Sequence, residues 1–360
     1  MRTKISYNNF VQGVISESLN GRYNLPLYRN GLSICNNFNL NYSGGLKYRT
    51  GLEYINTTED SYYIPFIFNK EQSYLIQFTA TSIFFLTYIG GKLDYVEDEG
   101  SVVELTNPYS LAESKEIRYA QNGDVMYIVH PDYVPQKLTR TSATTFTMED
   151  VVYSPSSPFT VDTGYPASVS FYEKRLYYGG VKNKPTFLYG SDAGDYDTFT
   201  FSGTEDDLDG FKFDIAEISQ AINWIKAGEN SLILGTTEGI VSVNGGAQNE
   251  SITKTNIFAR KVIDEGAKES LPIKVDNSIL FIDFTNRRTR YINYDIISES
   301  FKSPDLNLAN LDLTIGGLKK LMNKKDTNNL FYVVKDNGEM LVASFIANEN
   351  SNGWSRLKTP

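Results

Sequence analysis

Few residues in this 360-residue chain could carry out nucleophilic or metal chemistry, because it contains one histidine and one cysteine. His130 precedes a proline, and lone histidines in such turns are usually structural. We therefore expect neither a Ser-His-Asp triad nor a multi-histidine metal site. Cys35 has no histidine near it in sequence and should pack as a small hydrophobic residue. The residue types thus predict a protein that is not an enzyme and holds no cofactor.

Paired carboxylates remain a candidate for chemistry. Asp192, Asp195 and Asp197 lie close together in the segment DAGDYDTF. Two such carboxylates could serve a glycosidase, and propeller folds do host glycosidases. The alternative is that these residues form a turn around Gly194, because β-turns select Asp and Gly. We favour the turn.

A second acidic segment runs from Glu205 to Gly210. Glu205, Asp207, Asp209 and Gly210 match positions one, three, five and six of a calcium-binding loop. The twelfth position is Ala216 instead of the bidentate glutamate that such a loop requires. Calcium binding is therefore the weaker hypothesis and a solvated acidic loop the stronger one.

Basic residues occur in two short clusters. One contains Arg287, Arg288 and Arg290, and the other contains Lys319, Lys320, Lys324 and Lys325. Neither has a ladder of aromatic residues beside it, so solvated faces or subunit contacts are favoured over nucleic-acid binding. The net charge of −9 also argues against a protein that holds DNA.

The elements that position these residues are predicted by a repeated hairpin, seen most clearly at residues 229–246. An apolar strand with a polar lead-in recurs at intervals of 51, 50, 56, 47 and 51 residues. Its anchors are Leu75, Met126, Leu176, Leu232, Ile279 and Leu330. A period near ~50 with about four short strands is typical of propeller blades. We predict an all-β fold with about six blades, and a two-sheet sandwich is the alternative.

Residues 1–51 differ from the repeats, so we divide the chain into an N-terminal arm at 1–51 and a propeller domain at 52–360. Near the end of the arm, Phe38, Leu40 and Tyr42 alternate with polar residues before a Ser-Gly-Gly turn, which predicts a hairpin. Otherwise, the arm could be an extended leader that pairs with the first or last blade. No apolar run approaches the ~18 residues that span a bilayer, and we expect a soluble protein.

The arm resembles the N-terminal signature of the tail tubular protein B family, the tail nozzles of short-tailed bacteriophages. The resembling residues are Phe10, Gly13, Ser16, Leu19, Gly21, Arg22, Tyr28, Gly31, Cys35, Asn37, Phe38, Gly44, Gly45, Arg49 and Gly51. Later segments are also similar to this family: IPFIFNKEQSYLIQF, RYAQNGDVMYIVHPDYVPQKLTR, PASVSFYEKRLYYGG, LYGSDAGDYDTF and INWIKAGENSLILGTTEGIVSV.

The resemblance implies a structural virion component. Such subunits form a ring, usually of six copies, below the portal and adaptor, and DNA passes through it during ejection. The protein would be assembled in the host bacterial cytoplasm and would contact the adaptor and other tail proteins, with Phe10, Gly13, Leu19, Arg22, Tyr28 and Phe38 in the assembly arm. A receptor-binding or glycan-processing propeller at the tail tip is the alternative function.

Two departures from the family pattern bear on this expectation. Thr50 stands where family members often have proline, and the chain stops at GWSRLKTP, where a further strand or blade would be expected. Blade closure could then depend on the arm or on a neighbouring subunit. For the DNA path we expect repulsion instead of binding, with some of Glu205, Asp206, Asp207 and Asp209 facing the lumen.

Overall fold

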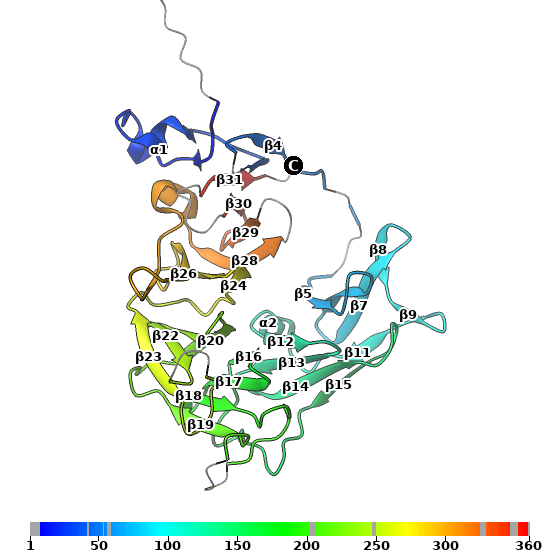
Figure 1. Ribbon diagram of the computed structural model, residues 1–360. Helices are drawn as coiled ribbons and strands as arrows, with labels where there is room; N and C mark the ends of the chain where they lie inside the picture. The colour runs from blue at the N-terminus through cyan, green and yellow to red at the C-terminus, as the bar shows by residue number, and fades with distance from the viewer. Residues whose placement is uncertain are drawn as a thin grey trace, which may run out of the picture. The chain divides into compact units, whose positions relative to one another are not determined.

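The computed structural model of the protein consists mainly of short β-strands (Figure 1). It describes residues 8–358 apart from 42, 53, 56–58, 202, 204–205, 247–249, 325–328 and 346–351. The chain divides into two compact units, one of Met1–Gly51, Gly235–Val241 and Lys261–Pro360, the other of Leu52–Leu234 and Ser242–Arg260. Every helix in the described ranges is too short or too polar to cross a bilayer.

Three antiparallel sheets belong wholly to the second unit. The first has the order β11-β7-β6-β5, with β8 also paired to β7: β5 Tyr62–Ile67, β6 Ser73–Phe78, β7 Ser82–Ile89, β8 Lys92–Tyr95 and β11 Glu104–Thr106. The second comprises β12 Arg118–Asn122, β13 Val125–His130, β14 Tyr133–Arg140 and β15 Phe146–Asp150. The third comprises β16 Ser168–Tyr172, β17 Arg175–Val181, β18 Lys184–Gly190 and β19 Phe211–Asp214. A small hairpin, β9 Glu97–Asp98 and β10 Ser101–Val102, lies between β8 and β11, and helix α2, Leu111–Ser114, connects the first sheet to the second.

Three further sheets follow along the chain. The fourth contains residues of both units and comprises β20 Ile222–Ala227, β21 Leu232–Thr236, β22 Gly239–Asn244 and β23 Phe258–Ile263. The fifth comprises β24 Ile273–Val275, β25 Ser278–Ile282, β26 Thr289–Asp295 and β27 Ser300–Lys302. The sixth comprises β28 Leu318–Lys324, β29 Leu330–Lys335, β30 Met340–Ser344 and β31 Trp354–Leu357. The 3-10 turn η2, Leu308–Thr314, precedes the sixth sheet.

These successive sheets, four of which are simple four-stranded meanders, are the blades of a β-propeller. The predicted fold class is confirmed, since a sandwich would distribute its strands between only two sheets. Each of the six predicted anchors lies on the second strand of its sheet: β6, β13, β17, β21, β25 and β29. In the first sheet, β11 takes the outer position beside β7, and β8 forms a side hairpin with β7.

Burial shows one error of register among the anchors. Met126, Leu176, Leu232, Ile279 and Leu330 are all buried. Leu75, by contrast, is half-buried, and its neighbours Tyr74 and Ile76 face the core. Because side chains alternate between the two faces of a strand, an alignment that is wrong by one residue places the anchor on the opposite face.

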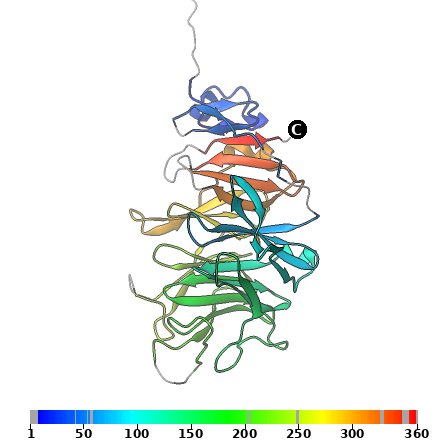
Figure 2. The ribbon, with the colours of Figure 1, turned by 90° about the vertical axis from the view of Figure 1, so that its right-hand side faces the viewer.

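The arm is part of the first unit. Strand β1, Gly13–Val14, pairs in parallel with β31 on one side and with β2, Gly31–Leu32, on the other, so the sixth sheet has six strands. Figure 2 shows the blue arm beside the red β31. Val14 and Cys35 join the core cluster that contains Trp354. The alternative in which the leader pairs with the last blade is therefore the observed one.

The predicted hairpin of the arm is confirmed as β3, Phe38–Leu40, and β4, Leu46–Tyr48. Tyr42 lies outside the described residues. Besides the strands already given, the described residues of the arm form a 3-10 turn, η1 at Glu17–Leu19, and a four-residue helix, α1 at Pro26–Arg29. Pro26 begins α1, where its missing N–H leaves no hydrogen bond unmade.

The second and third sheets share one core cluster, and this arrangement positions the site described below. Tyr127 and Val129 of β13 pack in the same cluster as Leu176 and Tyr178 of β17. The proline-containing linker between the sheets has no regular structure, yet its Phe159 packs edge-on against Tyr178. The aromatic side chains thus hold the two sheets in a fixed relation within this unit.

Candidate functional site

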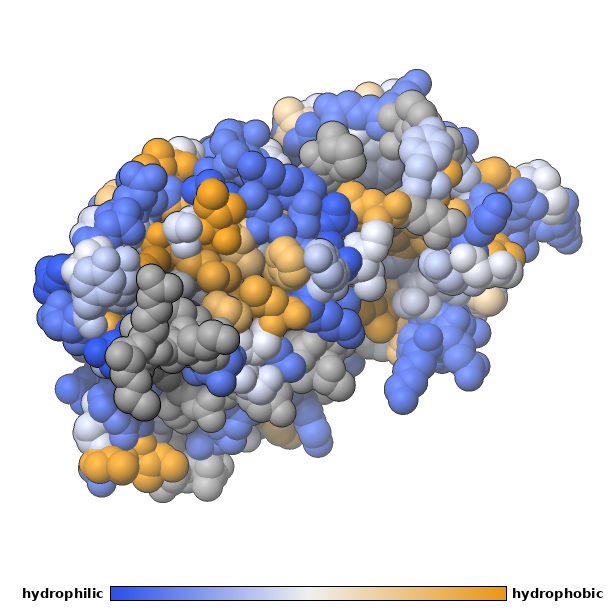
Figure 3. Space-filling model, turned by 90° about the horizontal axis from the view of Figure 1, so that it is seen from above, coloured by the Kyte–Doolittle hydropathy of each residue, from blue (hydrophilic) through white to orange (hydrophobic). Residues whose placement is uncertain are grey.

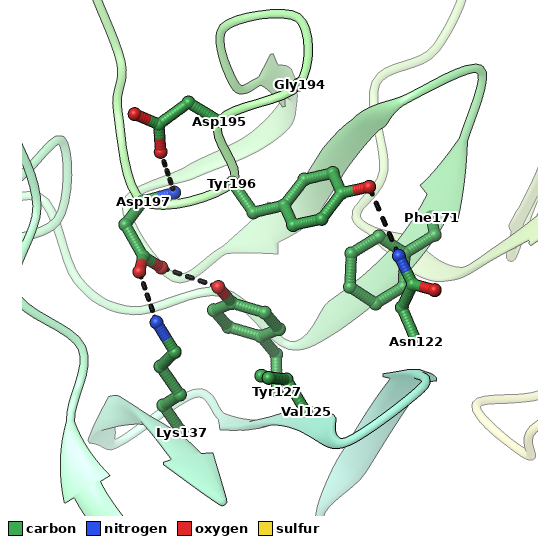
Figure 4. A pocket seen from close by; sticks show the side chains of 9 residues that line it. All are labelled: Asn122, Val125, Tyr127, Lys137, Phe171, Gly194, Asp195, Tyr196 and Asp197. Carbon is green, nitrogen blue, oxygen red and sulfur yellow. Dashed lines mark hydrogen bonds and ion pairs between the residues drawn. The ribbon is translucent and has the colours of Figure 1, made fainter. Parts of the chain in front are cut away.

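A cavity of about 220 Å³ opens between the second and third sheets (Figure 4). Strands β12, β13, β14 and β16 contribute five of its side chains, and the loop after β18 contributes the rest. We call it the Asp197 pocket, and its lining residues are Asn122, Val125, Tyr127, Lys137, Phe171, Gly194, Asp195, Tyr196 and Asp197.

Asp197 is the centre of the polar side of the pocket. Its carboxylate accepts a hydrogen bond of 2.6 Å from the Tyr127 hydroxyl and forms an ion pair with the Lys137 ammonium (Figure 4). Burial raises the pKa of Tyr127, and the hydrogen bond to Asp197 raises it further, so the phenol stays protonated. An acceptor and two donors are therefore held in fixed positions at neutral pH.

The opposite side of the pocket is aromatic. Phe171 and Tyr196 meet edge to face with their ring centroids 4.9 Å apart, and Phe171 meets Tyr127 in the same way at 5.8 Å. The Asn122 amide nitrogen donates to the Tyr196 hydroxyl at 3.1 Å. Each ring is thus fixed by a neighbour, as edge-to-face pairs favour.

The other two aspartates of this loop maintain its shape. Asp195 accepts hydrogen bonds from the Asp197 amide at 3.2 Å and from the Thr198 hydroxyl at 2.9 Å. Asp192 accepts from the Thr200 amide and hydroxyl and from the Gly210 amide, at 2.8, 2.7 and 2.6 Å. These are the local hydrogen bonds by which aspartate stabilises turns.

The three aspartates do not have the surroundings that glycoside hydrolysis requires. A glycosidase needs one carboxyl group that stays protonated to donate to the leaving oxygen. Lys137 and Tyr127 instead engage the carboxylate of Asp197, and backbone amides engage that of Asp192. The pocket therefore suits binding better than acid–base catalysis.

The acidic segment is attached to the third sheet by Arg175, whose guanidinium donates to the carbonyl oxygens of Ser191, Asp207 and Asp209. Lys254 forms an ion pair with Asp209 at 2.9 Å, and both side chains are only 15% exposed. A hydrogen bond from Thr255 lowers the pKa of Asp207.

These contacts bear on the two predictions for this segment. Glu205 lies outside the described residues, while Asp207 and Asp209 are engaged by Thr255 and Lys254. Across the described part of the chain, no three His, Cys, Asp or Glu side chains are grouped closely enough to hold a metal ion. Asp206 and Asp207 are exposed, whereas Asp209 is mostly occupied by its ion pair.

His130 and Cys35 are both buried. The Nδ1 atom of His130 accepts from the Asp132 amide at 3.2 Å, and its ring packs against Tyr109 and Tyr133. Cys35 lies in the core of the first unit, where burial raises the pKa of its thiol. Neither residue lines the Asp197 pocket.

The arginines of the first basic cluster are engaged within their own unit. Arg288 pairs with Asp305 at 2.9 Å, and Arg290 pairs with Glu265 at 3.2 Å. Arg287 donates to the Leu311 carbonyl oxygen at 3.0 Å. In the second cluster, Lys319, Lys320 and Lys324 lie on β28, while Lys325 is outside the described residues.

The predicted assembly residues of the arm fall into two groups. Phe10, Gly13 and Phe38 lie where the arm packs on its own unit: Phe10 donates its amide to Gly44, and Phe38 stacks on Tyr48 with centroids 4.5 Å apart. Leu19, Arg22 and Tyr28 instead belong to the projecting segment 17–30. Arg22 is exposed there, and Tyr28 meets the exposed Tyr23 edge to face at 5.2 Å.

Figure 3 shows a surface that is mostly hydrophilic, with separate apolar patches.

Sequence reasoning found the three aspartates but missed the strand residues that complete the pocket, Asn122, Val125, Tyr127, Lys137 and Phe171. These residues come from four strands of two sheets, so no spacing along the chain brings them together. The only signal available was the alternation of β13, which places Val125 and Tyr127 on one face.

Neither a family model nor a curated protein matches this sequence. Among solved structures, the chain is similar to "YCF48 bound to D1 peptide", with 11% identity, a TM-score of 0.46, and coverage of 85% of this chain and 88% of that one. It is also similar to the Pan2 WD40 domain of Neurospora crassa, with 8% identity, a TM-score of 0.44, and coverage of 81% and 76%. At these values the likeness concerns the β-propeller fold and extends to no function.

Proposed function

We propose that this protein is a structural subunit of a bacteriophage tail, of the nozzle type, that assembles into a ring and conducts DNA during ejection. In this role it is made in the host bacterial cytoplasm, joins the adaptor and other tail proteins, and works in the virion. The proposal rests first on the resemblance of the arm to the tail tubular protein B signature.

The observation that carries the proposal is that signature residues have demanding positions in the fold. Asn37 adopts a left-handed conformation with φ of 62°. Its side-chain oxygen accepts from Arg49 Nε at 3.1 Å and from the Lys358 amide at 2.8 Å. Gly13 lies against Trp354 at a φ of +59°. These structural roles support treating the residues as a signature, because each of them restricts the residue type at its position.

The distribution of charge supports self-assembly. Residues 1–51 contain six basic side chains and one acidic one, which leaves 28 basic and 42 acidic residues, a net −14, in the rest of the chain. The exposed Arg22 and Arg29 lie beside Tyr23 and Tyr28, and Arg and Tyr are residue types enriched at protein interfaces. A basic surface on one copy facing an acidic body on the next is a heterologous contact, which generates rings when the rotation closes.

The acidic body supports a conduit that repels DNA. Strong binding to duplex DNA requires a basic surface. In the first basic cluster, however, Arg288 and Arg290 form ion pairs within their own unit. An acidic ring would keep DNA away from its wall by repulsion screened over a Debye length of about 8 Å. Exposed Asp206 and Asp207 are the candidates for this surface.

Electron microscopy of the purified protein tests the assembly directly. We expect closed rings in negative stain, and we expect Arg22→Glu with Arg29→Glu to give folded subunits without rings. Lys47→Glu is the matched control, because Lys47 is also an exposed basic residue of the arm but lies on β4. Single subunits alone for the wild-type protein at micromolar concentration would contradict the proposal.

A truncation of the arm is a poorer test of assembly. Val14 and Cys35 lie in the core of the first unit, so deleting residues 1–36 would remove part of that core together with the projecting segment. Substitutions at Arg22 and Arg29 separate assembly from folding, because both side chains are exposed.

DNA binding provides the second test. The protein should show no measurable affinity for duplex DNA at about 0.15 M salt, and ejection should slow when Asp206 and Asp207 are changed to Lys. Asp209 is left unchanged because its ion pair with Lys254 is part of the fold. Tight binding of duplex DNA that weakens steeply with salt would indicate that the protein holds the DNA, and it would overturn the mechanism of a repelling conduit.

A further inference from the structure

We propose that the Asp197 pocket is a sugar-binding subsite that takes one neutral pyranose ring. The inference is independent of the tail role, because it rests only on the shape, charge and fixed geometry of this pocket. The proposal covers binding of the sugar and not its hydrolysis, because Asp192, Asp195 and Asp197 are all engaged by hydrogen bonds or an ion pair within the protein.

The aromatic side of the pocket requires a ligand with a flat apolar face. Tyr196 and Phe171 both line the cavity and meet edge to face at 4.9 Å, and Tyr196 is partly exposed, so this side offers aromatic surface to a ligand. The C–H groups on one side of a pyranose form such a face and pack on aromatic rings.

The polar side requires groups that both donate and accept hydrogen bonds. Lys137 is a donor, the Asp197 carboxylate is an acceptor, and the Asn122 amide and Tyr196 hydroxyl can do both. Neighbouring hydroxyl groups on a sugar ring can accept from Lys137 and donate to Asp197 at the same time. This mixture of donors and acceptors fits a polyhydroxylated ligand.

Charge excludes the common alternatives. An anionic ligand such as a phosphate would face two carboxylates, Asp195 and Asp197, against one ammonium group, Lys137. A metal cation would lie beside the Lys137 ammonium group, and among the described residues no three His, Cys, Asp or Glu side chains are grouped to hold one. A neutral ligand meets neither difficulty, and its hydroxyl groups replace water on groups that stay paired with one another.

Size limits the ligand to one ring. The cavity holds about 220 Å³, which is below the roughly 300–1,000 Å³ of sites for drug-sized ligands. The lining is also fixed in advance, because Asp197 is held by Tyr127 and Lys137, and Tyr196 is held by Asn122. Such preorganisation lowers the entropy that binding costs.

Titration of the full-length protein with four probes tests the inference: the methyl glycosides of glucose, galactose, mannose and N-acetylglucosamine. We expect at least one to bind in a saturable way with a dissociation constant of about 1 mM, the range for a ligand of this size. Calorimetry measures the affinity, and saturation-transfer NMR identifies the sugar face that contacts the protein.

Two variants assign the binding to this pocket. Asn122→Ala at the exposed rim should weaken binding about three- to tenfold, as the loss of one hydrogen bond does. Tyr196→Leu should weaken it further by removing the flat ring. Tyr88→Leu is the matched control, because Tyr88 is a 69% exposed tyrosine on β7 that does not line the pocket, and it should leave binding unchanged.

Three results would overturn the inference: no binding of any probe to the folded wild-type protein, unchanged binding by Asn122→Ala and Tyr196→Leu, or equal weakening by Tyr88→Leu. Each is distinct from failure of the tail proposal. If the protein forms rings but binds none of the four sugars, only the sugar-binding proposal is contradicted. If it stays as single subunits but binds a sugar through Tyr196, only the ring proposal is contradicted.

Discussion

Gly13 lies directly against the backbone of Trp354, at opposite ends of the chain. A Cβ atom at position 13 would be 2.3 Å from the Trp354 carbonyl oxygen and 2.5 Å from its amide nitrogen, and the φ of Gly13 is +59°. Both the closeness and the left-handed conformation require glycine. This contact is where strand β1 is added to β31.

We therefore predict that Gly13→Ala destabilises the first unit by about 2 kcal/mol or more, because strain and a backbone clash act together. Gly21→Ala is the matched control: its φ is +78°, but nothing lies within 4 Å of an added Cβ. It should cost only about 1 kcal/mol. Urea unfolding measures both changes, and equal destabilisation would show that the contact with Trp354 does not matter.

The repeat anchors should differ in their importance for stability. Leu232 is fully buried, so Leu232→Ala should lower the unfolding free energy by about 2–5 kcal/mol. Ile279→Ala should fall in the same range, since Ile279 is only 2% exposed. Leu75→Ala should cost clearly less, because Leu75 is half-buried. Thermal denaturation of the three variants gives the order, and a larger loss at Leu75 would contradict the observed register.

The folded protein should become less stable as the pH drops below 6.5, the ordinary pKa of a histidine side chain such as that of His130. Burial lowers the pKa of His130 in the folded protein, against the opposing charges of Asp132, Glu113 and Glu116. The unfolded chain then binds the proton more readily, so protonation favours unfolding. Between pH 7.5 and about 5.5, His130→Asn should show a flatter stability profile than the wild type. Parallel profiles for the two proteins would exclude this role.

Asp209 should matter for stability where Asp206 does not. Asp209 and Lys254 are each 15% exposed, so Asp209→Asn leaves a mostly buried ammonium group without its counter-charge. We expect a loss of about 1–3 kcal/mol. Asp206→Asn should change stability by less than about 0.5 kcal/mol, because Asp206 is exposed. Similar effects of the two substitutions would mean that the acidic segment is not held by Lys254.

The sequence alone determined the fold class and the order of the sheets. Strand-length apolar runs and turns repeat at about 50 residues, and each blade forms from strands adjacent in the chain, so local pattern is enough. The prediction that Leu75 faces the core was wrong. The repeats were aligned on the polar residues before each strand, and a shift of one residue moves a side chain to the opposite face of the strand.

Tertiary structure alone decided the contacts between distant segments. Gly13 meets Trp354, Lys137 pairs with Asp197, and Asn122 and Phe171 meet Tyr196, through pairings that no local spacing encodes. The sequence identified Asp192, Asp195 and Asp197 as a turn or a carboxylate set, but the choice depends on their partners. Lys137 and Tyr127 come from another sheet, and they engage Asp197 through an ion pair and a hydrogen bond that depend on its neighbours in space.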